Sequence, residues 1–225
     1  MTQALTYTPD ADPARAHGPY PGTFIVFEGG DGSGKTTQIK LLAEALTERG
    51  YSVLVTREPG GTDIGEKLRA LVLEHGNGSI DPHTEALIFA ASRAAHAHQK
   101  IQPALEAGTI VLCDRYIDSS AAYQGAGRGL GLETITDLSR WATGNLLPDI
   151  TVLLDVSLAE SRARAGARGH ADRMEAADDT FHSALHSAFR SLAQAAPERY
   201  ALINGAQPIE QVHKQVLDAA LAVLS

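Results

Sequence analysis

Short runs of consecutive apolar residues alternate along the chain with longer stretches in which apolar residues recur every three or four positions. The first run, Phe24-Ile25-Val26-Phe27, is apolar at every position, which is typical of a strand buried on both faces of a sheet. The next stretch, 35–49, places Ile39, Leu42 and Leu46 on one helical face. This spacing predicts an amphipathic helix directly after the first strand.

The same rhythm continues to the end of the chain. Strands are predicted at 24–28, 52–56, 109–113, 150–155 and 200–203, and helices near 35–49, 63–75, 82–107, 132–142, 158–165, 178–195 and 208–224. Such alternation indicates an α/β fold, in which right-handed crossovers place helices on both faces of a five-stranded parallel sheet. Ligands of such sheets bind beyond the carboxyl ends of the strands. Glu28, Arg57, Asp114 and Asp155 close strands at that edge.

Between the first strand and the first helix lies Gly29-Gly30-Asp31-Gly32-Ser33-Gly34-Lys35-Thr36, which fits the pattern G-x-x-x-x-G-K-[ST]. In this P-loop pattern, glycines let backbone N–H groups turn inward around a polyphosphate and Lys35 reaches its β and γ oxygens. The Thr36 hydroxyl is placed to ligate Mg²⁺ at the helix N-terminus. The alternative is a glycine-rich turn that matches by chance, but the flanking strand and helix favour nucleotide binding.

Composition limits the remaining possibilities. With 225 residues, of which 44% are hydrophobic, the chain can bury one sizeable core. Its apolar stretches are too short to span a bilayer, and a net charge of −8 argues against a general nucleic-acid surface. The only cysteine, Cys113, ends an apolar run, which favours a buried, inert thiol and a reducing compartment.

Residues 1–22 carry four prolines and no helical or strand periodicity, which predicts a flexible tail before a single domain at 23–225. Guanine-specific switch proteins add an N-K-x-D motif after a later strand, and this sequence has none. Motor and transport ATPases need further domains or large partner surfaces, for which so compact a chain leaves little room. A small phosphotransferase fits better.

Four motifs then make the chain resemble one family. Arg57-Glu58-Pro59-Gly60-Gly61-Thr62 follows the P-loop, Asp114-Arg115-Tyr116 leads into Ser119-Ser120-Ala121-Ala122-Tyr123-Gln124-Gly125, and Asp172-Arg173-Met174-Glu175 comes last. In this order and spacing they resemble the motifs of bacterial thymidylate kinases over residues 23–225. The resemblance implies a three-layer αβα P-loop kinase domain with a mobile lid at about 162–175. It also implies a cytoplasmic homodimer, and the charge and the short apolar stretches predict that it binds neither nucleic acid nor membrane.

The implied reaction transfers the γ-phosphoryl group of ATP to dTMP, giving dTDP and ADP for dTTP synthesis, with Mg²⁺ as cofactor. A monophosphate already offers an anionic oxygen, so such an enzyme needs alignment and positive charge rather than a strong base. The resemblance makes Lys35, Arg115 and a lid arginine the catalytic cations. Thr36 and Asp114 are expected to hold the metal. An Asp-Arg pair with a purely structural role is the alternative for Asp114 and Arg115.

The family pattern also assigns the two nucleotide sites. ATP is expected to contact Gly29, Gly30, Asp31, Gly32, Ser33, Gly34, Lys35, Thr36, Thr37 and Arg164. The acceptor dTMP is expected to contact Asp31, Glu58, Pro59, Phe89, Arg93, Arg115, Ser120, Tyr123 and Gln124. By resemblance the Glu58–Pro59 peptide is expected to be cis, and Tyr123 is expected to lie against the deoxyribose. A plain Gly/Pro-rich turn and a buried structural tyrosine are the respective alternatives.

Phe89 and Arg93 are four residues apart on the helix near 82–107 and so share a face. The resemblance implies that Phe89 stacks on thymine and that Arg93 donates to its O4, whereas sequence alone favours Phe89 as a core residue. His96 and His98 on the same helix are two residues apart and therefore point to different sides. Solvated or helix-packing roles are favoured over metal binding for both histidines.

The last expectation concerns the cation opposite the γ-phosphoryl group. The P-loop has no basic side chain besides Lys35, whereas the stretch 162–173 offers four arginines among small residues, as a mobile lid does. By resemblance to the subtype with lid arginines, Arg168 is the catalytic arginine and Arg164 lies near adenine. A solvated basic helix face is the alternative. For the whole chain, the alternatives are another nucleoside-monophosphate kinase and a catalytically idle P-loop regulatory module.

Overall fold

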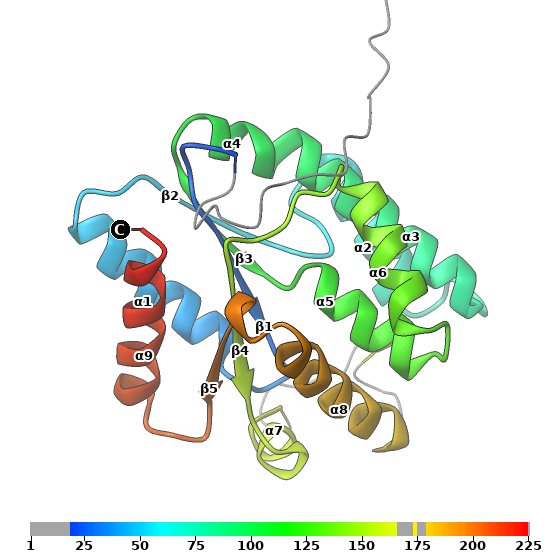
Figure 1. The fold of residues 1–225 in the computed structure, drawn as a ribbon. Helices are drawn as coiled ribbons and strands as arrows, with labels where there is room; N and C mark the ends of the chain where they lie inside the picture. Colours follow the sequence, from blue (N-terminus) through cyan, green and yellow to red (C-terminus); the bar gives the residue numbers. More distant parts are fainter. Residues whose placement is uncertain (1–18, 166–172, 175–178, 225) are drawn as a thin grey trace, which may run out of the picture.

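The computed structural model describes residues 19–165, 173–174 and 179–224. Within these ranges, five strands form one sheet in the order β2-β3-β1-β4-β5, and all neighbouring strands pair in parallel (Figure 1). The strands are β1 (Phe24–Glu28), β2 (Val53–Arg57), β3 (Ile110–Asp114), β4 (Ile150–Asp155) and β5 (Tyr200–Asn204).

Helices cover both faces of the sheet (Figure 1). The α-helices are α1 (Lys35–Glu48), α2 (Asp63–Leu73), α3 (Pro82–His96), α4 (Gln102–Glu106), α5 (Ile117–Ser120), α6 (Leu132–Ala142), α7 (Leu158–Ala165), α8 (Asp179–Ala195) and α9 (Ile209–Ala222). Two π-helical segments, η1 (Ala97–Ile101) and η2 (Ala121–Gly127), and a 3-10 turn, η3 (Pro197–Arg199), complete them. Among the described residues, no helix is long and apolar enough to cross a membrane.

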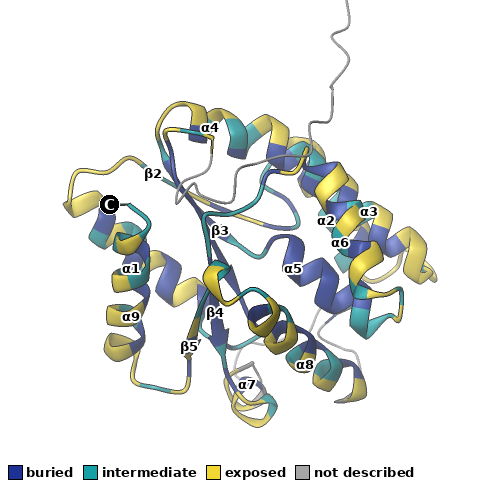
Figure 2. Cartoon of the chain, in the orientation of Figure 1, coloured by how far each residue is buried: buried dark blue, intermediate teal, exposed yellow. Residues whose placement is uncertain are grey.

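The central strand β1 divides the core into two layers. Ile25 and Phe27 pack with α1 and α9 on one face, whereas Phe24 and Val26 pack with η1 and α4 on the other. All five residues of β1 are buried, and Figure 2 shows buried residues along the central strands, with exposed residues on the outer sides of the helices. The apolar run therefore forms the strand that its composition predicts, because only a strand covered on both faces can bury every side chain.

The predicted strands and helices are confirmed within a few residues at their ends. The helix predicted at 82–107 is interrupted by the π-helical turn η1, after which Pro103, which has no N–H to donate, lies at the start of α4. The helical segment 117–127 was not predicted. Its sequence is rich in small residues and lacks apolar periodicity, so its helical form depends on burial against the rest of the domain.

The start of the described domain bears on the expected tail. Most of the predicted tail, residues 1–18, lies outside the described residues. Tyr20 packs against the core, and the Gly22 N–H donates to the Leu105 carbonyl at 2.9 Å.

Cys113 is buried and unpaired, and burial raises the pKa of its thiol well above the usual value. The expectation of a buried thiol is confirmed, and a raised pKa disfavours the reactive thiolate form.

The carboxyl ends of β1, β2 and β3 meet at one edge of the sheet. The Arg115 N–H donates to the Phe27 carbonyl, and the Glu58 N–H donates to the Asp114 carbonyl, each at 2.9 Å. These backbone bonds extend the strand pairing by one residue beyond the strands. They bring three sequence-distant motifs together at the edge where ligands of parallel sheets bind.

Candidate active site

The P-loop connects β1 to the N-terminus of α1. Gly29 and Gly34 have φ angles of 134° and 101°, a region that L-amino acids with side chains rarely occupy. A Cβ on Gly29 would also lie 2.6 Å from the Leu154 carbonyl oxygen. Lys35 Nζ donates to the carbonyls of Gly29 and Gly30 at 3.0 and 3.1 Å. The loop thereby curls around a buried ammonium group next to which an anion can bind.

Arg115 lies directly after β3 and faces the P-loop. Its φ angle is 69°, a strained backbone conformation of the kind that clusters at functional sites. Its guanidinium donates through Nη1 to the Gly29 carbonyl and to Ser119 Oγ, both at 3.1 Å, and through Nη2 to Asp31 Oδ1 at 2.6 Å. The arginine is therefore held in place before any ligand binds.

Charges around the loop are strongly coupled. Burial and then the charge of Arg115 lower the pKa of Lys35, while the carboxylates of Asp114, Asp31 and Glu28 act in the opposite direction. Burial would raise the pKa of Asp31, but Arg115 and Lys35 outweigh it and hold that pKa well below its usual range. Asp31 is therefore ionised at neutral pH.

Glu28 supports this cluster from below. It is fully buried, and it accepts hydrogen bonds from the backbone N–H groups of Tyr116 and Ser119 at 2.9 and 3.0 Å and lies 2.6 Å from Ser119 Oγ. Burial, followed by the nearby charge of Asp118, raises the pKa of Glu28 to about 7. With no exposed surface, this carboxyl group is placed to hold the turn after β3 rather than to touch a ligand.

Asp31 supplies the second anchor of the site. Besides Arg115, it accepts a hydrogen bond from the Tyr123 hydroxyl at 3.0 Å, and the Arg115 guanidinium lies over the Tyr123 ring at 5.1 Å from its centroid. These contacts give a physical reason for a carboxylate inside an anion-binding loop. Asp31 orients a cation and an aromatic ring at the mouth of the acceptor cavity.

Residues that would hold Mg²⁺ lie at the start of α1 and the end of β3. Thr36 Oγ1 is 3.5 Å from Asp114 Oδ2, and Asp114 Oδ1 is buried without a hydrogen-bond partner. Hard oxygen ligands of this kind suit Mg²⁺, which is usually bound by one or two protein groups together with phosphates and water. The two residues therefore fit the metal, and the described residues contain no cluster of three or more metal-ligating side chains.

Two cavities open on either side of this cluster. One, of about 190 Å³, lies between the P-loop, α2, α3 and η2, and the other, of about 690 Å³, lies along the P-loop toward α7 and α9. Asp31, Asp114 and Arg115 line both. Groups bound in the two cavities would therefore meet at these three residues.

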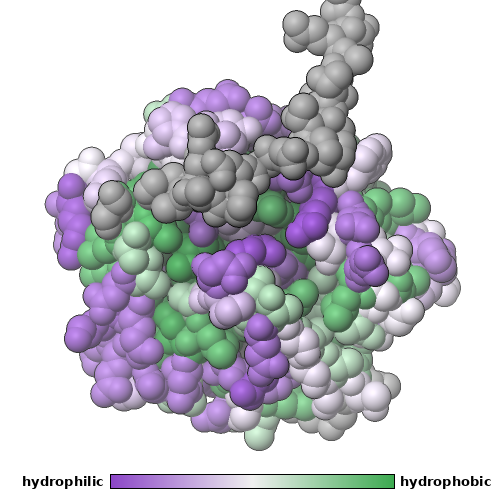
Figure 3. Space-filling model, viewed as in Figure 1, coloured by the Kyte–Doolittle hydropathy of each residue, from purple (hydrophilic) through white to green (hydrophobic). Residues whose placement is uncertain are grey.

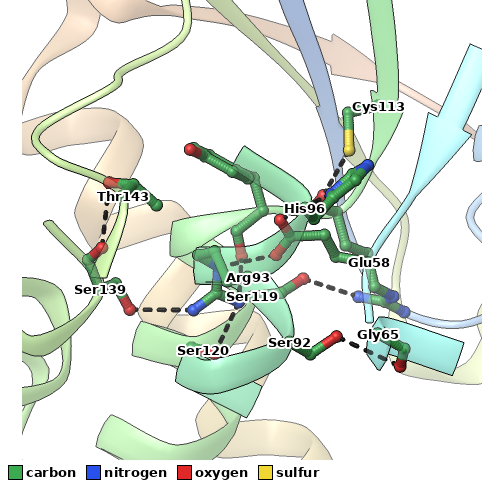
Figure 4. Close-up of polar contacts among 12 residues, drawn as sticks. Glu58, Gly65, Ser92, Arg93, His96, Cys113, Ser119, Ser120, Ser139 and Thr143 are labelled. Atoms are coloured by element: carbon green, nitrogen blue, oxygen red, sulfur yellow. Dashed lines mark hydrogen bonds and ion pairs between the residues drawn. The ribbon is translucent and has the colours of Figure 1, made fainter. Parts of the chain in front are cut away.

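The smaller cavity has a buried polar floor built around Arg93 (Figure 4). Arg93 Nε donates to Glu58 Oε2 at 2.7 Å, and Nη1 donates to Ser139 Oγ at 3.0 Å. Nη2 donates to the Tyr116 carbonyl at 3.2 Å and to Ser120 Oγ at 2.9 Å. Because a guanidinium carries five N–H groups, one N–H on Nη1 has no acceptor among the described residues.

His96 extends this polar floor on the far side of Glu58 from Arg93. Its Nδ1 lies 3.0 Å from Glu58 Oε1 and its Nε2 lies 2.7 Å from Thr56 Oγ1. Since a carboxylate only accepts hydrogen bonds, Nδ1 donates to Glu58. A Cβ on Gly61 would lie 2.6 Å from the His96 ring, so the glycines of the Arg57–Thr62 motif let the loop pack over it. His96 has the helix-packing role that its position predicts, and the Glu58–Pro59 peptide is cis, as expected.

Comparisons with known proteins agree with this geometry. A family model described as thymidylate kinase matches residues 27–216. The chain belongs to the thymidylate kinase family. A thymidylate kinase of Clavibacter sepedonicus is 51% identical over 196 residues, which are 87% of this chain and 92% of that protein. One of Exiguobacterium sibiricum is 47% identical over 203 residues, which are 90% and 96%.

A solved structure supports the same relationship. The crystal structure of thymidylate kinase from Ehrlichia chaffeensis superposes with a TM-score of 0.72 at 36% identity, covering 88% of this chain and 98% of that one. The expected α/β P-loop fold and the resemblance to thymidylate kinases are therefore confirmed, and the alternative of a chance glycine-rich turn falls away.

The structure brings the predicted nucleotide-site residues together. All nine residues expected to contact dTMP line the smaller cavity. Of those expected to contact ATP, all but Gly29 and Gly30 line the larger one, and these two glycines hold Lys35 through their carbonyls. Phe89, for which sequence alone favours a core position, is 9% exposed and forms part of the cavity wall.

Several wall residues escaped the sequence analysis. Arg69 and Leu73, four residues apart on α2, line the smaller cavity with Met174, and Arg69 Nη1 donates to the Pro59 carbonyl at 2.9 Å. The shared helical face of Arg69 and Leu73 is a signal that could have found them. Nothing in the local sequence marks Met174 as a wall residue, because it reaches the cavity through the tertiary fold.

The arginines of the predicted lid have different surroundings. Arg164 is exposed, lines the larger cavity, and donates through Nη1 to the Gly205 carbonyl at 3.0 Å. Arg168 and the side chain of Arg162 lie outside the described residues. Arg173 lies away from the P-loop, where its guanidinium pairs with buried Glu85. The role of Arg168 therefore stays a prediction.

Proposed function

We propose that the chain catalyses transfer of the γ-phosphoryl group of ATP to dTMP, giving dTDP and ADP. One observation carries this proposal beyond family membership. The P-loop cavity and the arginine-floored cavity meet at Asp31, Asp114 and Arg115, where a donor and an acceptor phosphate would lie end to end. Such an arrangement supplies the alignment on which phosphoryl transfer depends.

Besides aligning the two phosphates, the site supplies positive charge to stabilise the transferred phosphoryl group. Lys35, whose Nζ contacts the carbonyls of Gly29 and Gly30, would bind the β and γ phosphates. Arg115 lines both cavities with its guanidinium fixed by Asp31 and would contact both nucleotides. Thr36 and Asp114 would hold Mg²⁺, directly or through water, and the ion would supply positive charge to the phosphate oxygens. Because the dTMP phosphate is already an anionic nucleophile, no general base is required. Asp31, the carboxylate inside the loop, is engaged in holding Arg115.

The acceptor cavity suits a thymine base. Phe89 offers a ring for stacking, and the N–H on Arg93 Nη1 that has no acceptor among the described residues offers a charged donor for the thymine O4. Tyr123 is buried with its hydroxyl fixed on Asp31, which suits contact with a deoxyribose. On the donor side, Arg164 lines the larger cavity and would contact adenine, and by family resemblance Arg168 would act on the γ-phosphoryl group.

A coupled assay of ADP release across a panel of monophosphates tests the proposal. With ATP and Mg²⁺, turnover of dTMP should exceed that of dCMP, dGMP and AMP by at least tenfold in kcat/KM. Equal turnover across the panel would indicate a broader nucleoside-monophosphate kinase. Nucleotide binding without any turnover would indicate the idle regulatory module and overturn the proposal.

A homodimer is the assembly that we infer from family resemblance, and one surface supports it. Leu71 on α2, Leu87 on α3 and Trp141 on α6 are 48%, 58% and 82% exposed, on helices that pack side by side. Figure 3 shows hydrophobic patches on the side of the molecule where these helices lie, and such patches are typical of interaction sites. Sedimentation analysis should give twice the monomer mass, and Trp141→Asp should shift the measured mass toward that of the monomer.

The unpaired Cys113 suits the cytoplasmic location that we propose.

A further inference from the structure

Glu85 is a buried carboxylate that the proposed chemistry does not use. It lies in the first turn of α3, is 1% exposed, and does not line either cavity. It lies one helical turn before Phe89, behind the wall of the acceptor cavity. A buried charge is costly unless it is paired and hydrogen-bonded, so its partners indicate why it is there.

Both oxygens of this carboxylate are occupied. Oε1 accepts from Gln124 Nε2 at 2.9 Å and from Arg128 Nε at 3.2 Å. Oε2 accepts from Arg128 Nη2 at 3.3 Å and from Arg173 Nη2. Arg173 also donates through Nε to the Val72 carbonyl at 2.8 Å. Glu85 thus joins the end of α2, the segment η2 and residues 173–174 behind the cavity wall.

The contact with Gln124 has a chemical consequence. A carboxylate only accepts hydrogen bonds, so Gln124 must turn the NH₂ end of its amide toward Glu85. The other end, Oε1, has no donor among the described residues, and Gln124 lines the acceptor cavity. The amide is therefore held with an acceptor, and not a donor, left for a ligand.

This polarity matters for pyrimidine bases. Thymine presents an N–H donor at N3 beside the O4 acceptor, whereas cytosine presents an acceptor at N3 beside an amino group. An oxygen from Gln124 matches N3–H of thymine, and an NH₂ group in its place would match N3 of cytosine. Gln124 would then read N3 while the free N–H of Arg93 reads O4.

We propose that Glu85 is a positioning residue for base choice: it fixes the Gln124 amide with its oxygen toward the base and so favours thymine over cytosine. The inference rests on the proposed function. Arg128 and Arg173 have a supporting role, because their guanidinium groups donate to both oxygens of Glu85 and hold the carboxylate in place. The Arg128 guanidinium, which lies over the Phe181 ring at 4.7 Å, is in turn held by α8.

Glu85→Gln tests the proposal with little change in size. The oxygen of the new amide should face the Nη2 groups of Arg128 and Arg173, which both donate to it. Its NH₂ should face Gln124 and lose the 3.2 Å contact with Arg128 Nε, which also donates. Gln124 should then turn its own oxygen away from the base and present its NH₂ group to the cavity. We expect the preference for dTMP over dCMP, measured both as a ratio of kcat/KM and as a ratio of Kd by calorimetry, to fall at least tenfold, while the KM of ATP changes less than twofold.

Gln124→Met provides the matched control, because methionine is of similar size and cannot orient a hydrogen bond. In that background, Glu85→Gln should change the dTMP to dCMP ratio by less than twofold, since the amide through which Glu85 acts is gone. If Glu85→Gln lowers both substrates alike, or lowers the ratio equally with Met at 124, Glu85 has only a structural role and the proposal is wrong.

Glu85→Asp keeps the charge opposite the arginines but withdraws the oxygen from Gln124, and it serves if Glu85→Gln does not fold. Its ratio should also fall while its melting temperature stays close to that of the parent, and an unchanged ratio in this folded variant would overturn the proposal. A parent protein that does not prefer dTMP would instead refute the proposed function, so the two failures are distinguishable.

Discussion

Replacing Arg93 should separate its two roles, as a base reader and as part of the buried floor. Arg93 is 3% exposed and pairs with Glu58 at 2.7 Å, so Arg93→Met leaves the Glu58 carboxylate with His96 as its remaining side-chain partner. Removing one partner of a buried ion pair costs about 3–5 kcal/mol. For a domain of this size each kcal/mol lowers the melting temperature by about 2–4 °C, so we expect a drop of roughly 6–20 °C.

The effect on binding has a different size and a different substrate. The N–H on Arg93 Nη1 that has no acceptor among the described residues is a charged donor worth about 1.5–3 kcal/mol to a buried thymine oxygen. Its loss should raise the KM of dTMP by roughly 10–150-fold. The KM of ATP should change less than twofold, because Arg93 lines only the smaller cavity.

The double variant Arg93→Met with Glu58→Gln distinguishes the two roles. It removes both charges, so calorimetric melting should recover most of the lost stability, while steady-state kinetics should still show the high KM of dTMP. If the KM of dTMP returns toward the parent value with stability, or if dTMP and ATP weaken alike in the single variant, Arg93 is only a floor residue and the reasoning is refuted.

Three further predictions concern charged groups. Arg168→Ala should lower kcat by roughly 10²-fold or more with little change in ATP affinity, and a parent-like kcat in rapid kinetics would refute its role. Arg173→Ala, which removes one of the two arginines paired with Glu85, should chiefly lower the melting temperature measured by calorimetry. The pKa of Asp31 is depressed in the fold, so the stability that its charge contributes is present above its unfolded pKa of about 4 and is lost as the pH falls below that value toward the folded pKa. The difference in melting temperature between the parent and Asp31→Asn should therefore be constant from pH 8 to 5 and shrink at lower pH. A difference that does not change on acidification would contradict this role of Asp31. EDTA should abolish turnover and added Mg²⁺ restore it, and full activity with EDTA would exclude the metal.

The sequence predicted the fold well where burial is periodic. The run Phe24–Phe27 and the helix faces of α1 and α6 carry their burial pattern in the order of their residues, so strands and helices could be assigned from local spacing. The segment 117–127 could not, because its Ser, Ala and Gly residues have no apolar period and are buried through contacts with α6 and α8. Its helical form is imposed by tertiary packing.

The residues of the site also fall into those that local sequence could predict and those that it could not. The P-loop, Glu58 and Arg115 belong to contiguous motifs that follow strands, so their meeting at one sheet edge followed from the topology. Glu85 and His96 belong to no motif. Each is a polar residue on α3 that is buried only because partners 38 or more positions away, Gln124 for Glu85 and Glu58 for His96, satisfy its hydrogen bonds. Such long-range pairs cannot be deduced from spacing along one chain.

The most direct test of the account follows the phosphoryl group itself. The purified protein is incubated with dTMP, Mg²⁺ and ATP that carries an isotopic label on its γ-phosphoryl group, and the products are separated by chromatography. If the protein transfers the γ-phosphoryl group to dTMP, the label appears in dTDP, with one ADP formed for each dTDP. Label released as inorganic phosphate, or retained in ATP while both nucleotides remain bound, would contradict it.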